Sequence, residues 1–171
     1  TYYYEILPSN QLELGLWLES ERMFHAKVDS IGIATQKGVV IEEKKQSYDN
    51  RPYGSLLPEL FKRAFTKHPY RWITIGDADQ IRAAKDEEFK QFYESFYVPN
   101  NAVLVLAGDI NFADAKKLAE KYFTDIPAKK GEIYRPKMVE DIKYTELRDT
   151  IYDNIQLPAV FQGYHIPAMG S

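Results

Sequence analysis

Residues 102–107 form an unbroken apolar run between two clusters of turn-forming residues, and this run constrains the fold more than any other feature. The sequence AVLVLA follows Pro99-Asn100-Asn101 and precedes Gly108-Asp109. A short apolar run bounded in this way is typical of a β-strand that is covered on both faces. Because such a strand needs neighbouring strands and covering layers, we predict a sheet with helices packed against it.

The rest of the chain supplies elements of both kinds. Segments rich in β-formers or with alternating polarity, at 1–7, about 143–153 and 159–165, are candidate strands. Apolar residues at helical spacing predict helices after Ser9 or Asn10, over about 30–46, over 55–66, from a cap at Asp86, and from a cap at Asn111. This order predicts an α+β fold in which helices pack on a mostly antiparallel sheet in two layers.

Composition excludes several classes of protein. The chain has 171 residues, no Cys and a formal net charge of −3. This slightly acidic charge is ordinary for a soluble globular domain and argues against nucleic acid as the main partner. No apolar run approaches the roughly 18 residues of a membrane span. Both ends interrupt apparent strands, at Thr1 and after Ile166, so we expect a piece of a longer polypeptide.

Histidine spacing does not predict a metal site. The three histidines, His25, His68 and His165, are far apart in the sequence, so no zinc site follows from local spacing. We predict packing or hydrogen-bonding roles for all three. The absence of Cys excludes a thiolate nucleophile, and no Gly-x-Ser-x-Gly elbow is present.

Two carboxylates are more informative. Glu42 and Glu43 follow the apolar residues 39–41 on the predicted helix over 30–46, where apolar and acidic surfaces meet. Lys44 and Lys45 beside them equally favour a solvated helix face without chemistry. The loop after this helix, 49–54, is predicted to be shaped by Pro52 and by conformational freedom at Gly54. On the residues alone, the chain is an α+β domain whose function is open.

A series of short motifs, in order along the whole chain, resembles the pitrilysin/insulinase family of zinc metallopeptidases. The motifs lie at 16–23, 38–44, 49–54, 68–70, 75–76, 92–102, 104–110, 121–123, 156–158 and 166–167. Each motif is weak alone, but their number and order make the resemblance specific. It implies that residues 1–140 are the C-terminal part of a first pitrilysin-type α/β domain. Residues 141–171 would then be connecting strands that lead into the next domain.

The resemblance also implies a chemistry. Family members bind zinc through the two histidines of a His-x-x-Glu-His motif, whose Glu is the general base, and through a third ligand, a Glu on a later helix. Aligned on Val39-Val40, that third ligand corresponds to Glu43. Three protein ligands leave one position for a water molecule, which the zinc activates for peptide hydrolysis. The implied parent is therefore a zinc-dependent metalloendopeptidase with one zinc per active site, acting on peptides or unfolded polypeptides.

Two departures from the family pattern shape this hypothesis. The His-x-x-Glu-His motif is absent from these residues, so the 171-residue chain is expected to be inactive alone, with no catalytic residue of its own and with zinc absent or weakly bound. Gln36 stands where many active members have an acidic residue, seven positions before the ligand. Gln36 and Glu42 are then candidates to support a ligand by hydrogen bonding. The expected partners are the missing N-terminal segment and the C-terminal half of the same protein, or a homologous subunit.

Two alternatives remain at this point. The chain is compatible with a non-catalytic family homologue that serves as partner subunit of an active peptidase, which Gln36 favours. It is also compatible with a small stand-alone binding module, which predicts cooperative folding of residues 1–171 and no exposed apolar sheet edge.

Overall fold

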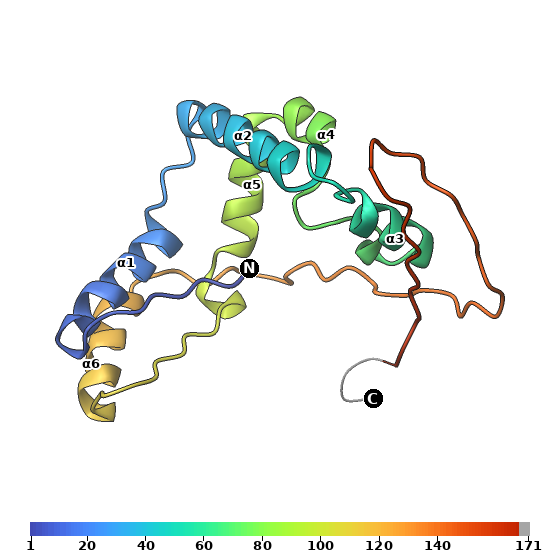
Figure 1. Cartoon of the computed structure of the whole chain (residues 1–171). Coiled ribbons are helices and arrows are strands. Elements are labelled where there is room, and N and C mark those ends of the chain that lie inside the picture. The colour runs from blue at the N-terminus through green and yellow to red at the C-terminus, as the bar shows by residue number, and fades with distance from the viewer. Residues whose placement is uncertain (168–171) are drawn as a thin grey trace. The chain divides into compact units, whose positions relative to one another are not determined.

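The computed structural model describes residues 1–167, which form helices joined by loops and long extended segments (Figure 1). The α-helices are α1 (Leu12–Phe24), α2 (Ser30–Lys44), α3 (Leu56–Ala64), α4 (Ala78–Ala83), α5 (Asp86–Phe96) and α6 (Phe112–Phe123). A π-helical turn, Lys45–Asp49, continues α2, and short 3₁₀ helices cover Ser9–Gln11, Pro69–Arg71 and Pro99–Asn101. None of the helices within residues 1–167 has the length and apolar character needed to cross a membrane.

The predicted α+β fold is wrong for this structure, because residues 1–167 contain helices and no β-strand. The run at 102–107 is extended, yet the exposed fractions of Val103 and Val105 are 89% and 77%. The segments predicted as strands at 1–7, 143–153 and 159–165 are likewise neither helical nor part of a ladder. An extended segment becomes a strand only when a neighbour supplies the matching N–H and C=O groups, and no described segment does so here.

The predicted helices are present, and the helix predicted after a cap at Ser9 or Asn10 is α1, whose cap is Gln11. The helix predicted over 30–46 is α2, and the helix predicted over 55–66 is α3, shorter by two residues at its C-terminal end than its predicted limit of Thr66. Asn111 caps α6 as predicted, because its Oδ1 accepts hydrogen bonds from the N–H groups of Ala113 at 2.9 Å and Asp114 at 3.3 Å. Asp86 is the first residue of α5 and not its cap, which is Lys85. Helix α4, capped by Asp77, was not predicted.

The chain divides into two compact units, and α2 begins in the first and continues in the second. Unit 1 consists of Thr1–Ile33 and Lys85–Tyr134, and unit 2 of Ala34–Ala84 with the chain from Arg135 onward.

In unit 1, α1 and α6 pack side by side (Figure 1). Leu16 of α1 is 2% exposed and Ala115 of α6 is 5% exposed, and both belong to the apolar core of this unit, together with Ile33, Val98 and Ile126. At the edge of this contact, the Glu13 carboxylate accepts hydrogen bonds from Lys121 Nζ at 2.6 Å and from the Tyr122 hydroxyl at 2.8 Å. These two donors lower the pKa of Glu13 below its ordinary value.

The lowered pKa predicts a pH-dependent contribution of Glu13 to stability. Because the folded state favours the ionised carboxylate, the contribution is present above the ordinary pKa of 4.5 and is lost as the pH falls below it. We expect Glu13→Gln to lower the melting temperature at pH 7, and the difference from the wild type to shrink under acid. Thermal denaturation between pH 7 and pH 3 checks this result.

The control for this prediction is Glu120→Gln. Glu120 pairs with Lys116 at 3.4 Å within α6, and both side chains are more than 60% exposed, so the pair contributes little to stability. Equal melting temperatures for the Glu13 variant and the wild type at pH 7 would contradict the assignment.

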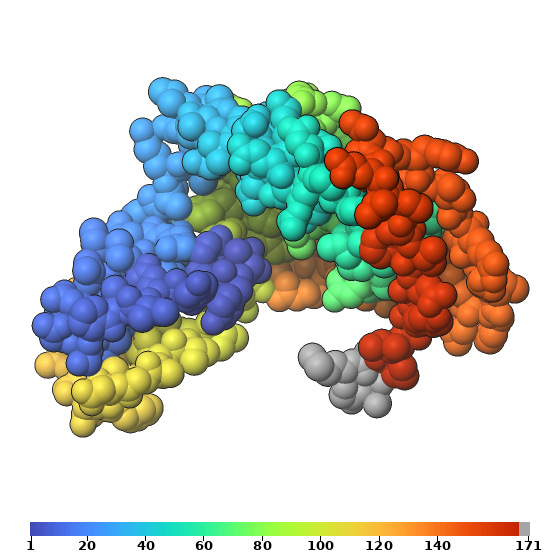
Figure 2. Space-filling model, viewed as in Figure 1, coloured from blue at the N-terminus to red at the C-terminus, as the bar shows by residue number. Residues whose placement is uncertain are grey.

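In unit 2, residues 136–167 have no regular secondary structure and contact α3 and the loops beside it at several points, and Figure 2 shows this orange-to-red segment beside the green atoms of the same unit. The Tyr53 hydroxyl donates a hydrogen bond to the Leu157 carbonyl at 2.7 Å, and the Tyr53 ring meets Phe161 edge-on. Gly163 lies so close to Leu60 of α3 that a Cβ at this position would come within 2.9 Å of a Leu60 methyl. The C-terminal segment is therefore held by a few specific contacts without secondary structure of its own.

Candidate functional site

Helix α2 carries all three residues that the sequence singled out for metal chemistry. Gln36, Glu42 and Glu43 lie on its uninterrupted stretch within unit 2. At 3.6 residues per turn, positions seven apart share one face, so Gln36 and Glu43 point the same way two turns apart. Glu42 is rotated by about 100° from Glu43. The helix therefore groups Gln36 with Glu43 and separates Glu42 from both.

The two glutamates also differ in their contacts. Glu42 Oε2 lies 3.3 Å from Lys45 Nζ, in a half-exposed ion pair. Glu43 is exposed, and within residues 1–167 its carboxylate takes part in no hydrogen bond or ion pair. Of the two, Glu43 has the carboxylate that remains available to an external ligand.

The backbone changes its geometry directly after these residues. Asn50 N–H bonds to the Lys45 carbonyl at 2.8 Å, five residues back, which is the spacing of a π-helix. Lys44 Nζ reaches Asp49 Oδ1 at 2.6 Å across the same turn. Single π-helical turns occur frequently at functional sites, and this one ends the helix that carries Glu43.

The loop that follows contains two further constraints. Tyr53 has a φ of 58°, in the left-handed region that a bulky side chain rarely adopts. A Cβ at Gly54 would lie 1.8 Å from the Tyr48 carbonyl oxygen and 2.9 Å from that of Arg51. The sequence predicted a loop here and assigned the conformational freedom to Gly54. In the structure the positive φ is at Tyr53, whereas Gly54 is required for space, and no local sequence signal indicates either fact.

Each of the three histidines is engaged with residues near it in its own unit. His25 Nδ1 is 3.0 Å from Glu21 Oε2, and His68 Nδ1 accepts a hydrogen bond from the Tyr70 N–H at 3.1 Å. His165 Nε2 is 2.8 Å from the Ala64 carbonyl oxygen, and its ring stacks on Phe65.

These positions do not combine into a metal centre. Across residues 1–167, no group of three or more His, Cys, Asp or Glu side chains is arranged to hold a metal ion. A zinc site with an open position needs three protein ligands, and Glu43 provides one carboxylate. The described residues therefore do not fit a zinc ion by themselves.

Comparisons with known proteins place the chain in a family. The profile of the family described as "Peptidase M16 inactive domain" matches residues 84–170, about half of the chain. "Zinc protease PqqE" of Helicobacter pylori is 28% identical over 170 residues, which are 98% of this chain and 38% of the relative. "Probable zinc protease PqqL" of Escherichia coli is 25% identical over 155 residues, which are 87% of this chain and 16% of the relative.

A more distant relative and a solved structure agree with these matches. "Mitochondrial-processing peptidase subunit beta" of Lentinula edodes is 22% identical over 145 residues, which are 85% of this chain and 31% of the relative. The crystal structure of a protease from Helicobacter pylori superposes with a TM-score of 0.75 at 29% identity, over 79% of this chain and 33% of that protein.

The chain spans less than two fifths of the length of each of these relatives, from 16% of PqqL to 38% of PqqE. The similarity nevertheless runs through nearly all of the chain, in agreement with the motifs that resemble the pitrilysin/insulinase peptidases. The chain belongs to the M16 peptidase family, through a region that matches its inactive domain.

Proposed function

We propose that this chain is part of a zinc-dependent metalloendopeptidase that hydrolyses peptide bonds. The observation that carries the proposal is the similarity to a protein named as a zinc protease over 98% of this chain. Because the chain corresponds to 38% of that relative, the proposed activity is that of a longer protein. The 171 residues alone are expected to be inactive.

Within that protein, Glu43 would supply one carboxylate ligand to the zinc. Three features support this role: Glu43 is exposed, its carboxylate has no partner within residues 1–167, and it lies on a regular helix that limits its motion. Gln36 shares its face and would hydrogen-bond a ligand or a water molecule there. The remaining ligands and the general base would come from residues outside this chain.

The proposed substrates are peptides or unfolded polypeptides, and the proposed partners are other parts of the same protein or a homologous subunit. Exposed apolar side chains support such partners. Val103 and Val105 in unit 1, and Ile142 and Tyr144 in unit 2, are all more than 70% exposed. Large exposed apolar surface is characteristic of surfaces that another segment covers, and it argues against a stand-alone binding module.

A second candidate function is that of a non-catalytic partner subunit. Two observations favour it: the matching family profile is described as an inactive domain, and Gln36 places an uncharged amide on the face of Glu43. A relative is also named as a subunit of a processing peptidase.

Metal analysis of the full-length protein separates the two candidates. The peptidase proposal predicts one zinc per active site and zinc-dependent cleavage of a fluorogenic peptide, which a chelator abolishes. A full-length protein that binds no zinc and cleaves no peptide would overturn this proposal and support the partner-subunit function.

A further inference from the structure

The extended segment 135–153 of unit 2, here called the strap, runs along α3 and the loop before Pro69 without secondary structure of its own (Figure 2). Polar contacts fasten it at several points, and these contacts are of two different chemical kinds. The difference between them predicts how the strap moves.

The first fastening is at Glu140. Its Oε1 accepts hydrogen bonds from the Thr66 N–H at 2.8 Å and the Thr66 hydroxyl at 2.7 Å. Its Oε2 accepts from the N–H groups of Lys67 at 2.7 Å and His68 at 2.8 Å. One carboxylate therefore receives four hydrogen bonds from uncharged donors on three consecutive residues.

This fastening is insensitive to ordinary changes of salt and pH. Hydrogen bonds from neutral donors to a carboxylate act at short range, so salt screens them less than it screens exposed charge pairs. The four donors hold the pKa of Glu140 well below its ordinary value, so the carboxylate stays ionised through mildly acidic conditions. The donor residues 66–68 lie in the loop that precedes the short helix Pro69–Arg71.

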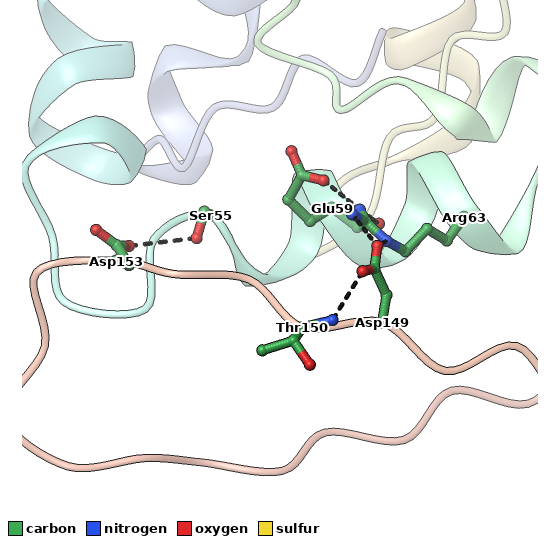
Figure 3. Close-up of polar contacts among 6 residues, drawn as sticks. All are labelled: Ser55, Glu59, Arg63, Asp149, Thr150 and Asp153. Carbon is green, nitrogen blue, oxygen red and sulfur yellow. Dashed lines mark hydrogen bonds and ion pairs between the residues drawn. The ribbon is translucent and has the colours of Figure 1, made fainter.

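The second fastening, nearer the C-terminal end of the strap, is an ion pair. Arg63 Nε and Nη2 both lie 2.5 Å from Asp149 Oδ2, and the two side chains are 29% and 46% exposed (Figure 3). Arg63 also pairs through Nη1 with Glu59 of its own helix, so the guanidinium is shared between two carboxylates. Beyond it, the Ser55 hydroxyl donates to Asp153 across a long 3.4 Å contact. Exposed pairs of this kind weaken as salt is added.

We propose that the strap is a salt-sensitive loop over α3: Glu140 fixes its first part to residues 66–68, the contacts of Leu157 and His165 hold the chain beyond it, and its part around Asp149 lifts away from α3 when the Arg63–Asp149 pair is broken. The Lys143 Nζ contact to the Arg63 carbonyl, at 2.6 Å, lies between the two fastenings and marks where the fixed part ends. Opening uncovers the surface of α3 around Arg63.

Distances between paired spin labels test this proposal, and the absence of Cys allows labels at chosen sites. One pair joins Leu57→Cys on α3 to Leu147→Cys near Asp149, and the other joins Leu57→Cys to Ile142→Cys near Glu140. All three positions are at least 47% exposed. Distances are measured by double electron–electron resonance at about 10 mM and about 1 M salt, over which the screening length falls from about 30 Å to about 3 Å.

The 57–147 distance is expected to lengthen and its distribution to broaden at high salt, and in Arg63→Gln at both salt concentrations. The 57–142 distance is expected to stay unchanged in these conditions and to broaden only in Glu140→Gln. Asp141→Asn is the matched control: Asp141 adjoins Glu140 but makes only an exposed pair with Lys67, at 2.6 Å, so its loss should leave the 57–142 distance unchanged.

Two results would overturn the proposal: a 57–147 distance that does not respond to salt or to Arg63→Gln, or a 57–142 distance that does not respond to Glu140→Gln. Helical content, measured by circular dichroism, shows whether each variant folds. If Glu140→Gln fails to fold, Glu140→Asp, which keeps the charge but shortens the side chain, is expected to broaden the same distance, and an unchanged distance in that variant overturns the proposal.

Discussion

Replacing Glu43 by Gln in the full-length protein is expected to reduce zinc binding by more than about a hundredfold and to abolish most peptide hydrolysis. Loss of a group that only supports a metal ligand costs about 10–100-fold in affinity, and loss of a ligand should cost more. The Gln side chain keeps the size and the hydrogen-bonding oxygen of Glu43 but removes its negative charge. Zinc content by mass spectrometry and the rate of cleavage of a fluorogenic peptide are the measurements.

Two neighbours on α2 provide matched controls. Glu42→Gln removes a carboxylate of the same kind from an adjacent position that faces Lys45, and it should leave zinc binding within about twofold of the wild type. Gln36→Ala should weaken zinc binding by about tenfold if this amide supports a ligand. Full retention of zinc and activity in the Glu43 variant would reject the ligand assignment, and equal losses in the Glu42 and Glu43 variants would indicate damage to the helix.

Gly54→Ala is expected to lower the free energy of unfolding by about 3 kcal/mol, the range typical of enforced backbone strain. The added Cβ would lie 1.8 Å from the Tyr48 carbonyl oxygen and within 3 Å of that of Arg51. Both are backbone atoms in the loop that follows the π-helical turn, so relief requires movement of the loop itself. Urea denaturation followed by circular dichroism measures the change.

Gly38→Ala is the control for this result. Gly38 lies inside α2, where an added Cβ would meet no atom of another element within 4 Å, and Ala is favoured over Gly in a helix interior by about 0.5–1 kcal/mol. The same chemical change should therefore stabilise the protein at position 38 and destabilise it at position 54. A Gly54→Ala variant as stable as the wild type would show that the loop adapts without cost.

Much of the helical structure was predictable, because helices depend on interactions between residues close in sequence. The cap at Asn111 and the apolar spacing after it located α6, and the patterns over 30–46 and 55–66 located α2 and α3. The placement of Gln36 and Glu43 on one face also followed from their spacing once the helix was known. The order of the short motifs along the chain was also sufficient to identify the family, and the comparisons confirmed it.

The failures have a different physical origin. The run at 102–107 has the composition of a buried strand, but strand formation depends on a partner that the described residues do not supply, so Val103 and Val105 are exposed. Glu140 could not be identified as an anchor, because its hydrogen-bond donors are more than 70 residues away in the sequence. Tyr53 adopts its left-handed φ in a loop, and its hydroxyl donates a hydrogen bond to the carbonyl of Leu157, which is far away in the sequence. Local pattern thus specified most of the helices, the cap at Asn111 and the family, whereas pairing, burial and the fastening of the strap arose from contacts between distant residues, whose energies no local pattern contains.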